Sequence, residues 1–355
     1  MLALPSASAV TNALVQLAPS STNLAAPWVA GQTTRLMEDM LQARVDEIQN
    51  LCCDTSCGTD KPQQDLRKCN GDEQPSNWWA KTFGNAGSQG DVDNNFGYDT
   101  KTYGLVLAYD RPVGENTRAG ISAGYANSTI DGNNSSGETT IDSYQLTGYL
   151  NYTPGPWYVQ GALTAGMDRY EGERQITFPG VNRMAKSDYD GQQYTALVSA
   201  GKHFYFDQEV TVTPFASLQT SLIKVDSYKE SGAGGLNHRV DDQDYNLTQS
   251  GVGVKVERVI RSGTSTYSPE VHVKWMHDFS DTSTEQTAVL TGGGSAFNVE
   301  GIEQDRDLYN VGAGITFLSC NCDNSSWTVK GQYDYKWNDS EYSSNQLSLI
   351  ASLKY

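Results

Sequence analysis

Apolar and polar residues alternate with a period of two over most of the chain from Trp78 onward. In residues 144–152, Tyr, Leu, Gly, Leu and Tyr are interleaved with Gln, Thr, Tyr and Asn. Residues 252–257, 327–337 and 346–355 show the same alternation. A period of two indicates β-strands with one apolar and one polar face. Most of these segments reach the length of about 9–11 residues that a tilted strand needs to cross a bilayer.

The connections between the predicted strands alternate in length. Five short ones are Arg111–Asn116, Pro154–Pro156, Asp207–Glu209, Arg261–Thr266 and Ser319–Ser325. Six longer ones are Gly87–Gly97, Asp131–Glu138, Glu171–Asp188, Lys229–Asp244, Phe279–Gln304 and Asn338–Ser344. Outer-membrane barrels have short periplasmic turns and longer extracellular loops. We therefore predict an all-β fold in which residues 77–355 form a twelve-stranded antiparallel transmembrane β-barrel, closed between the strands at Trp78 and at Leu347–Tyr355.

Aromatic residues gather near both ends of the predicted strands. Trp78, Trp79, Tyr109 and Trp157 lie beside short turns, whereas Tyr125, Tyr170, Tyr228 and Trp337 lie near the longer loops. Amphipathic rings favour the two interfaces between a bilayer and water. Two such bands support the barrel over a soluble β-sandwich.

Residues 1–76 show a different pattern. Between Leu36 and Leu51 the apolar residues recur at the spacing of one helix face. The other face carries the charged residues Arg35, Glu38, Asp39, Arg44, Asp46 and Glu47. A helix of this length needs a surface on which to dock, and a barrel lumen offers one. We predict that residues 1–76 form a linker, an α-helix threaded through the pore and a Cys-rich connection.

Charged residues at inward positions of the strands could hold that helix. Strand alternation assigns nine of them to the lumen: Asp110, Asp168, Lys255, Glu257, Glu270, Lys274, Lys330, Asp334 and Lys336. The alternative is that these charges face water in an open lumen. We favour the helix as a plug, because its charged face would then meet charged partners.

Composition and charge narrow the class of protein. The mean hydropathy is −0.53. No run of about 18 apolar residues occurs, which excludes a helical membrane protein. The 34 Gly and 20 Tyr suit barrel strands, although a soluble sandwich would share them. The net charge of −17 argues against a nucleic-acid partner, because such a partner requires a basic face.

Six cysteines indicate an oxidising compartment. Cys52, Cys53, Cys57 and Cys69 form one group, and Cys320 and Cys322 lie in a short turn predicted on the same periplasmic side. A metal site is the alternative, but the spacing matches no paired C-x2-C pattern, and the four histidines all lie in the barrel region. We therefore expect disulfides, with at least one between the two groups.

Catalytic motifs are missing from the sequence. It contains no G-x-S-x-G, and the calcium-like run Asp131–Gly137 lacks the bidentate Glu of a calcium loop. We predict that the chain is not an enzyme and has no cofactor or metal ion.

The stretches Trp78–Gly84, Tyr103–Arg111 and Ala119–Tyr125 resemble the start of the β-barrel domain of autotransporters, the type V secretion family. Ala13–Pro19, with the later Arg35-Leu36, resembles the segment that joins passenger to barrel in that family. The resemblance covers nearly the whole chain. It implies a twelve-stranded barrel with a helix in its pore and an N-terminal passenger exported to the cell surface.

The C-terminal strand also resembles the signal read by the barrel-assembly machinery. Leu353 and Tyr355 fit that signal, whereas Ile350 stands where it has Gly. Family members that cleave themselves do so at an Asn-containing junction, often Asn-Asn or Asp-Asn, inside the pore helix. The helix here offers only Asn50-Leu51, with Asn23-Leu24 before it, so we assign no cleavage site.

We therefore expect a monomeric translocator and anchor in the outer membrane of a Gram-negative bacterium. Its expected partners are outer-membrane lipid and lipopolysaccharide, the barrel-assembly machinery and a covalently attached passenger. A passenger-less pore or an adhesin acting through its loops is the alternative, and an outer-membrane hydrolase is third. The stretch ending at Ala9 has no basic region and is too short for a signal peptide, so we interpret the start as an artificial boundary or as that of a truncated precursor.

Overall fold

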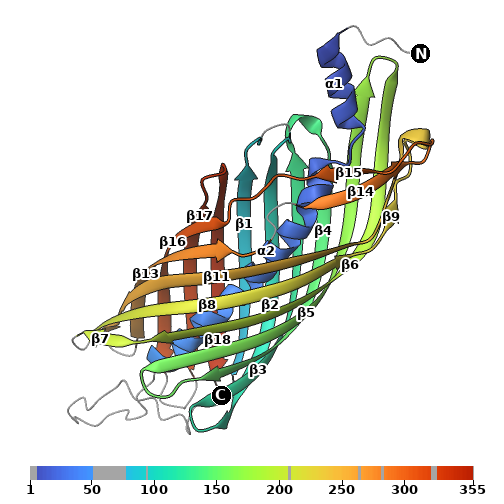
Figure 1. The fold of residues 1–355 in the computed structure, drawn as a ribbon. Coiled ribbons are helices and arrows are strands. Elements are labelled where there is room, and N and C mark those ends of the chain that lie inside the picture. Colours follow the sequence, from blue (N-terminus) through green and yellow to red (C-terminus); the bar gives the residue numbers. More distant parts are fainter. Residues whose placement is uncertain are drawn as a thin grey trace, which may run out of the picture.

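The computed structural model describes residues 6–50, 77–92, 95–206, 209–262, 265–280, 284–320 and 326–354. Figure 1 shows a tall β-barrel with one helix running along its interior and a second helix standing above one rim. Among the described residues, neither helix is long and apolar enough to cross a lipid bilayer.

Twelve long antiparallel strands form the barrel wall. They are β1 (Asn77–Gln89), β2 (Tyr98–Gly114), β3 (Thr117–Gly132), β4 (Glu138–Tyr152), β5 (Trp157–Phe178), β6 (Val181–Lys202), β8 (Val210–Val225), β11 (Gln243–Arg258), β13 (Ser265–Asp278), β16 (Asp307–Cys320), β17 (Ser326–Trp337) and β18 (Tyr342–Lys354). The ring closes because β1 pairs with β18, from Asn77 opposite Lys354 to Gln89 opposite Tyr342. The predicted twelve-stranded barrel and its closure are confirmed.

The strand β4 shows how the alternating sequence builds this wall. Leu146 and Leu150 are 54% and 55% exposed on the outside, whereas Gln145 and Thr147 are buried inside. Apolar side chains face outward around the whole barrel; further examples are Leu105, Leu107, Ile121, Leu163, Val198, Leu218, Val271, Val273, Ile315, Leu347 and Leu349. Such a surface is the inverse of a soluble barrel and suits contact with lipid, because the lumen rather than the exterior is wet.

Aromatic pairs lie at both ends of the wall. The rings of Trp78 and Tyr109 lie 5.0 Å apart beside the short turns, and those of Tyr125 and Tyr144 lie 5.2 Å apart near the long loops. We call these two ends of the barrel the turn end and the loop end. Trp79 was predicted to belong to the turn-end band. This prediction is wrong, because Trp79 points into the lumen and is buried there.

Two short connections are described throughout and are confirmed as tight turns. Asn116, between β2 and β3, has a φ of 59°, and Gly155, between β4 and β5, has a φ of 62°. Two short strands, β7 (Phe204–Phe206) and β12 (Ile260–Ser262), lie beside the predicted turns at Asp207–Glu209 and Arg261–Thr266.

The loop predicted at Glu171–Asp188 is wrong. β5 and β6 remain paired up to Phe178 opposite Val181, so this stretch is a hairpin that rises above the rim (Figure 1). Its charged residues resemble a loop in sequence, yet burial still alternates along both strands.

The predicted loops Lys229–Asp244 and Phe279–Gln304 also contain regular structure. β9 (Tyr228–Lys229), β10 (His238–Val240), β14 (Glu285–Leu290) and β15 (Phe297–Glu300) form a separate four-stranded antiparallel sheet at the loop end. Two short 3-10 helices accompany the loops: η2 (Asn133–Ser135) and η3 (Gly234–Leu236).

Two α-helices precede the barrel, α1 (Ala7–Gln16) and α2 (Ser21–Asn50). The predicted helix was limited to residues near Leu36–Leu51, whereas α2 begins at Ser21 and includes Pro27. Pro27 has no N–H for the carbonyl of Asn23, and Gln286 Nε2 donates to that carbonyl instead, at 3.3 Å. A side chain of the loop-end sheet therefore binds the carbonyl that Pro27 leaves without its helical partner.

Candidate functional site

The first half of α2 is surrounded by a ring of apolar wall and loop residues at the loop end, which we call the collar. Ala25, Ala26, Val29 and Ala30 are buried against it. The collar comprises Tyr98, Ile130, Ile141, Tyr170, Tyr189, Ile223, Val225, Tyr228, Val240, Leu247, Ala288 and Ile302. Small helix residues let the wall approach closely, and a Cβ added to Gly31 would lie 2.6 Å from Leu247 Cδ1. The collar leaves little space for water around this part of the helix.

Replacing Gly31 with Ile is expected to push α2 away from the collar. Forcing extra methylenes into a packed interior costs about 1–3 kcal/mol. Hydrogen exchange of residues 24–36 measures the effect, and Gly161→Ile, where nothing lies within 4 Å of an added Cβ, is the matched control. Equal exchange in both variants would mean that the collar does not grip the helix.

Polar groups fix the start of α2 beside a stack of tyrosines. The rings of Tyr170 and Tyr189 lie 4.9 Å apart, and those of Tyr189 and Tyr228 lie 4.2 Å apart, all nearly parallel. Asn23 Nδ2 donates to Tyr228 Oη at 3.3 Å, and Asn23 Oδ1 accepts from Thr139 Oγ1 at 2.8 Å. The helix therefore has a defined entry into the lumen.

Towards the turn end, the fully buried Asp110 of β2 joins α2 to the wall. Arg44 of α2 donates from Nε to Asp110 Oδ2 at 2.8 Å and from Nη2 to Oδ1 at 3.0 Å. Arg118 of β3 donates to Oδ1 from Nε at 2.9 Å and from Nη2 at 2.6 Å. Trp79 Nε1 and Tyr149 Oη donate to Oδ2 at 3.0 and 3.1 Å. We call these five residues the Asp110 cluster. It compensates the buried carboxylate with two guanidinium groups and two neutral donors.

Between the collar and the Asp110 cluster, the wall binds the helix main chain. Lys81 Nζ donates to Leu36 O at 2.6 Å, and Gln160 Nε2 donates to Leu41 O at 2.9 Å. Thr164 Oγ1 donates to Glu38 Oε1 at 2.7 Å. Since a helical carbonyl has a second lone pair, these bonds leave the helix intact.

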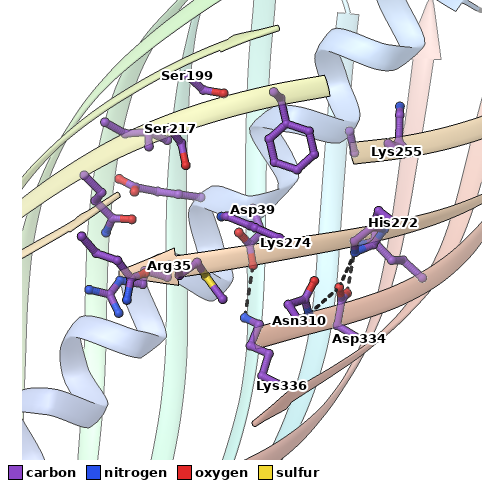
Figure 2. Close-up of a pocket in the computed structure, with 18 of the residues that line it drawn as sticks. Arg35, Asp39, Ser199, Ser217, Lys255, His272, Lys274, Asn310, Asp334 and Lys336 are labelled. Carbon is purple, nitrogen blue, oxygen red and sulfur yellow. Dashed lines mark hydrogen bonds and ion pairs between the residues drawn. The ribbon is translucent and has the colours of Figure 1, made fainter. Parts of the chain in front are cut away.

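A polar cavity of about 120 Å³ lies beside α2, lined mainly by β8, β11, β13, β16 and β17 and reaching β5 and β6 at one edge. Figure 2 shows Asp39 of the helix facing Lys336 across it, at 3.5 Å. Along the same wall, His272 Nε2 lies 2.7 Å from Asp334 Oδ1, and Lys330 Nζ lies 2.7 Å from Glu270 Oε1. The helix therefore leans on one half of the wall and leaves a hydrophilic space along the other half.

All nine charges assigned to the lumen by strand alternation lie on the inner face, and eight of them are buried; Lys274 is half-buried at the cavity. Arg44 meets Asp110, and Asp39 meets Lys336. Six of the other lumen charges have partners in the wall: Lys255 lies 3.4 Å from Glu257, Lys330 lies 2.7 Å from Glu270, Asp334 lies 2.7 Å from His272, and Asp168 accepts from Ser143 at 2.5 Å. Lys274 lines the cavity together with Asp39 of the helix.

The other charged residues of the helix find different partners. Arg35 lies 3.8 Å from Asp278, which was not among the predicted lumen charges, and Glu38 accepts from Thr164. The side chains of Asp46 and Glu47 lie outside the described residues.

Several contact residues were missed. Lys81 and Arg118 occupy inward positions, so the same alternation would have found them. Trp79 was interpreted as an interfacial residue because it follows Trp78, but adjacent residues of a strand point to opposite faces.

The cysteine predictions fall largely outside the described residues, which exclude Cys52, Cys53, Cys57, Cys69 and Cys322. Cys320 ends β16, and its side chain is not described. The disulfides therefore stay a prediction. In the C-terminal strand, Leu353 is exposed on the outside, and Tyr355 lies outside the described residues.

Within the described ranges, no three His, Cys, Asp or Glu side chains are grouped to hold a metal ion. The absence of metal, cofactor and enzymatic activity stays a prediction.

Comparison with known proteins agrees with this architecture. The family model for the autotransporter beta-domain matches residues 78–334. Esterase EstA of Pseudomonas aeruginosa is 23% identical over 309 residues, covering 84% of this chain and 47% of EstA. The chain thus spans about half the length of that relative.

Two solved structures share the fold. The translocator domain of the autotransporter NalP from Neisseria meningitidis has a TM-score of 0.62 at 16% identity, covering 91% of this chain and 98% of that domain. The beta domain of the Bordetella autotransporter BrkA has a TM-score of 0.56 at 18% identity, covering 79% and 99%. The chain therefore belongs to the autotransporter beta-domain family, and its barrel is a translocator domain of the bacterial outer membrane.

Proposed function

We propose that this barrel exports the polypeptide preceding α2 to the cell surface and then keeps α2 in its lumen as plug and anchor. The direction of the helix carries the proposal. α2 starts at the loop end, below α1, and runs towards the turn end, where β1 begins (Figure 1). Because short turns face the periplasm, residues 6–20 lie on the extracellular side.

The contacts of α2 support its retention. The collar closes the extracellular half, and the Asp110 cluster fixes the periplasmic half. Residues 1–76 thus serve as linker and pore helix, and residues 77–355 as the membrane anchor. The paired charges of the lumen are engaged with the helix and with one another. This supports the proposal that the barrel itself contributes no catalytic group. The esterase activity in the name of EstA is that protein's own.

The outer surface of the barrel and its closed ring of strands also support the proposed membrane environment and partners. The apolar outer band would contact outer-membrane lipid and lipopolysaccharide. The barrel-assembly machinery would insert the domain by its C-terminal strand, and the closed ring leaves no open sheet edge, which supports a monomer. An open pore remains the second candidate, and the polar cavity beside α2 is the observation that favours it.

An epitope tag tests the direction of export. A signal peptide and the tag are placed before residue 6, and an otherwise identical protein carries the tag in the turn at Pro154–Pro156. The N-terminal tag should bind antibody on intact cells, whereas the turn tag should bind only after the outer membrane is permeabilised. The opposite pattern, or an N-terminal tag that stays hidden, would contradict the proposed export.

A further inference from the structure

The chain crosses the rim between α2 and α1 in contact with a buried polar cluster. Arg174 of β5 donates from Nη1 to Gln16 O at 2.7 Å, and His238 of β10 donates from Nε2 to Leu17 O at 2.9 Å. Thr177 N also donates to Gln16 Oε1 at 2.6 Å. Two neighbouring main-chain carbonyls of the exported segment are therefore bound by side chains of the barrel.

Glu230, next to β9, organises these donors. Its Oε1 accepts from Arg174 Nε at 3.1 Å, and its Oε2 accepts from Arg174 Nη2 at 2.6 Å and from His238 N at 2.7 Å. Burial alone would raise the pKa of Glu230, but these bonds and the charge of Arg174 lower it to about 2. The carboxylate thus orients the guanidinium and leaves Nη1 directed at the exported chain.

An apolar pocket completes the site. Leu17 packs with the buried Ile176, Ala185 and Ala233, beside Phe178, Val181 and Leu236. The loop that supplies Ala233 is bound closely to the hairpin, since Arg183 Nη1 donates to Ala233 O at 2.7 Å. Gly232, at a φ of 92°, permits this approach, because a Cβ there would lie 2.5 Å from Met184 O.

This cluster is not needed to close the barrel. The ring of paired strands is complete below it, and a buried ion pair is weak evidence for stability because desolvation offsets its attraction. Arg174, in the β5–β6 hairpin, and Glu230, in the loop next to β9, are both buried, and both lie beyond the apolar band. The arrangement of Arg174 and Glu230 is explained by their role in binding the main chain at Gln16 and Leu17.

We propose that Arg174, Glu230 and His238, with the apolar pocket around Ile176, form a polypeptide-binding site that clasps the exported chain as it leaves the lumen. The site binds two main-chain carbonyls, the amide oxygen of Gln16 and one apolar side chain, so it selects an aliphatic residue at position 17. The site holds the exported chain against the β5–β6 hairpin where it leaves the lumen. A pulling force on the exported polypeptide would therefore act on the hairpin before it acts on α2. The inference rests on the proposed export.

Hydrogen exchange measured by mass spectrometry on the full chain in lipid nanodiscs tests the clasp. Arg174→Ala and Leu17→Glu should each speed exchange of residues 7–20 by at least about tenfold. Arg169→Ala, an exposed arginine of the same strand that pairs with Asp190, is the control and should change nothing. Leu17→Ile should also leave exchange unchanged, because the pocket needs only an aliphatic side chain.

Leu17→Glu alters the bound chain and leaves the barrel groups in place, so it stays informative if Arg174→Ala disturbs the hairpin. Continued protection of residues 7–20 in Leu17→Glu would overturn the clasp. Equal acceleration of residues 36–45 in that variant would overturn it too, because the site would then be part of the plug. The epitope experiment judges export separately, so a surface-exposed tag with unchanged protection rejects the clasp alone.

Discussion

Replacing Asp110 with Ala is expected to destabilise the protein by about 3–5 kcal/mol and to free the periplasmic half of α2. Without the carboxylate, Arg44 and Arg118 remain as two buried like charges facing one another. Trp79 and Tyr149 also lose a hydrogen-bond acceptor. Chemical unfolding followed by tryptophan fluorescence measures the stability, and hydrogen exchange of residues 41–45 measures release of the helix.

Asp190→Ala is the matched control for this substitution. Asp190 also pairs with an arginine, Arg169, but at 3.8 Å and with both side chains exposed. Exposed pairs contribute about 0–1 kcal/mol, so this change should leave stability and helix exchange nearly unaltered. A loss with Asp110→Ala no larger than with Asp190→Ala would show that the cluster does not hold the helix.

The barrel was predictable because the membrane imposes a rule on every strand. Residues facing lipid must be apolar and those facing the lumen are free to be polar, so period-two alternation reports the wall directly. The same rule placed all nine wall charges on the inner face. It could not say which of them meet the helix, since that depends on the rotation and depth of α2 in the lumen.

The first half of α2 escaped prediction for a physical reason. Residues 24–31 are small or apolar on all sides and include Pro27, so no amphipathic period marks them. The helix forms because the collar surrounds it. A helix buried all round has no polar face to reveal it in sequence.

The hairpin formed by the loop-end parts of β5 and β6 was missed for a different reason. Glu171, Glu173 and Asp188 suggested a loop, yet each belongs to a paired strand whose alternate residues are buried. That burial comes from Leu17, just after α1, and from the loop around Ala233, both distant in sequence. The polypeptide-binding site around Arg174 and Glu230 could therefore not be predicted from the sequence, because residues far apart in the chain form it.

Closure of the pore by α2 should appear as a large difference in electrical conductance. The lumen of a barrel without its helix would be a wet channel, whereas the collar around α2 blocks it at the loop end. In planar bilayers we expect the variant that lacks residues 6–50 to conduct several-fold more than the full chain. Circular dichroism establishes that the shortened protein keeps its β-structure.

A variant that lacks only residues 6–16 provides the decisive comparison, because α1 stands outside the lumen (Figure 1). Single-channel recording of the three proteins under identical conditions tests directly whether α2 is the plug. Our expectation is that the full chain and the variant without α1 conduct equally little, and that conductance rises only when α2 is removed. Equal conductance with and without α2 would contradict it.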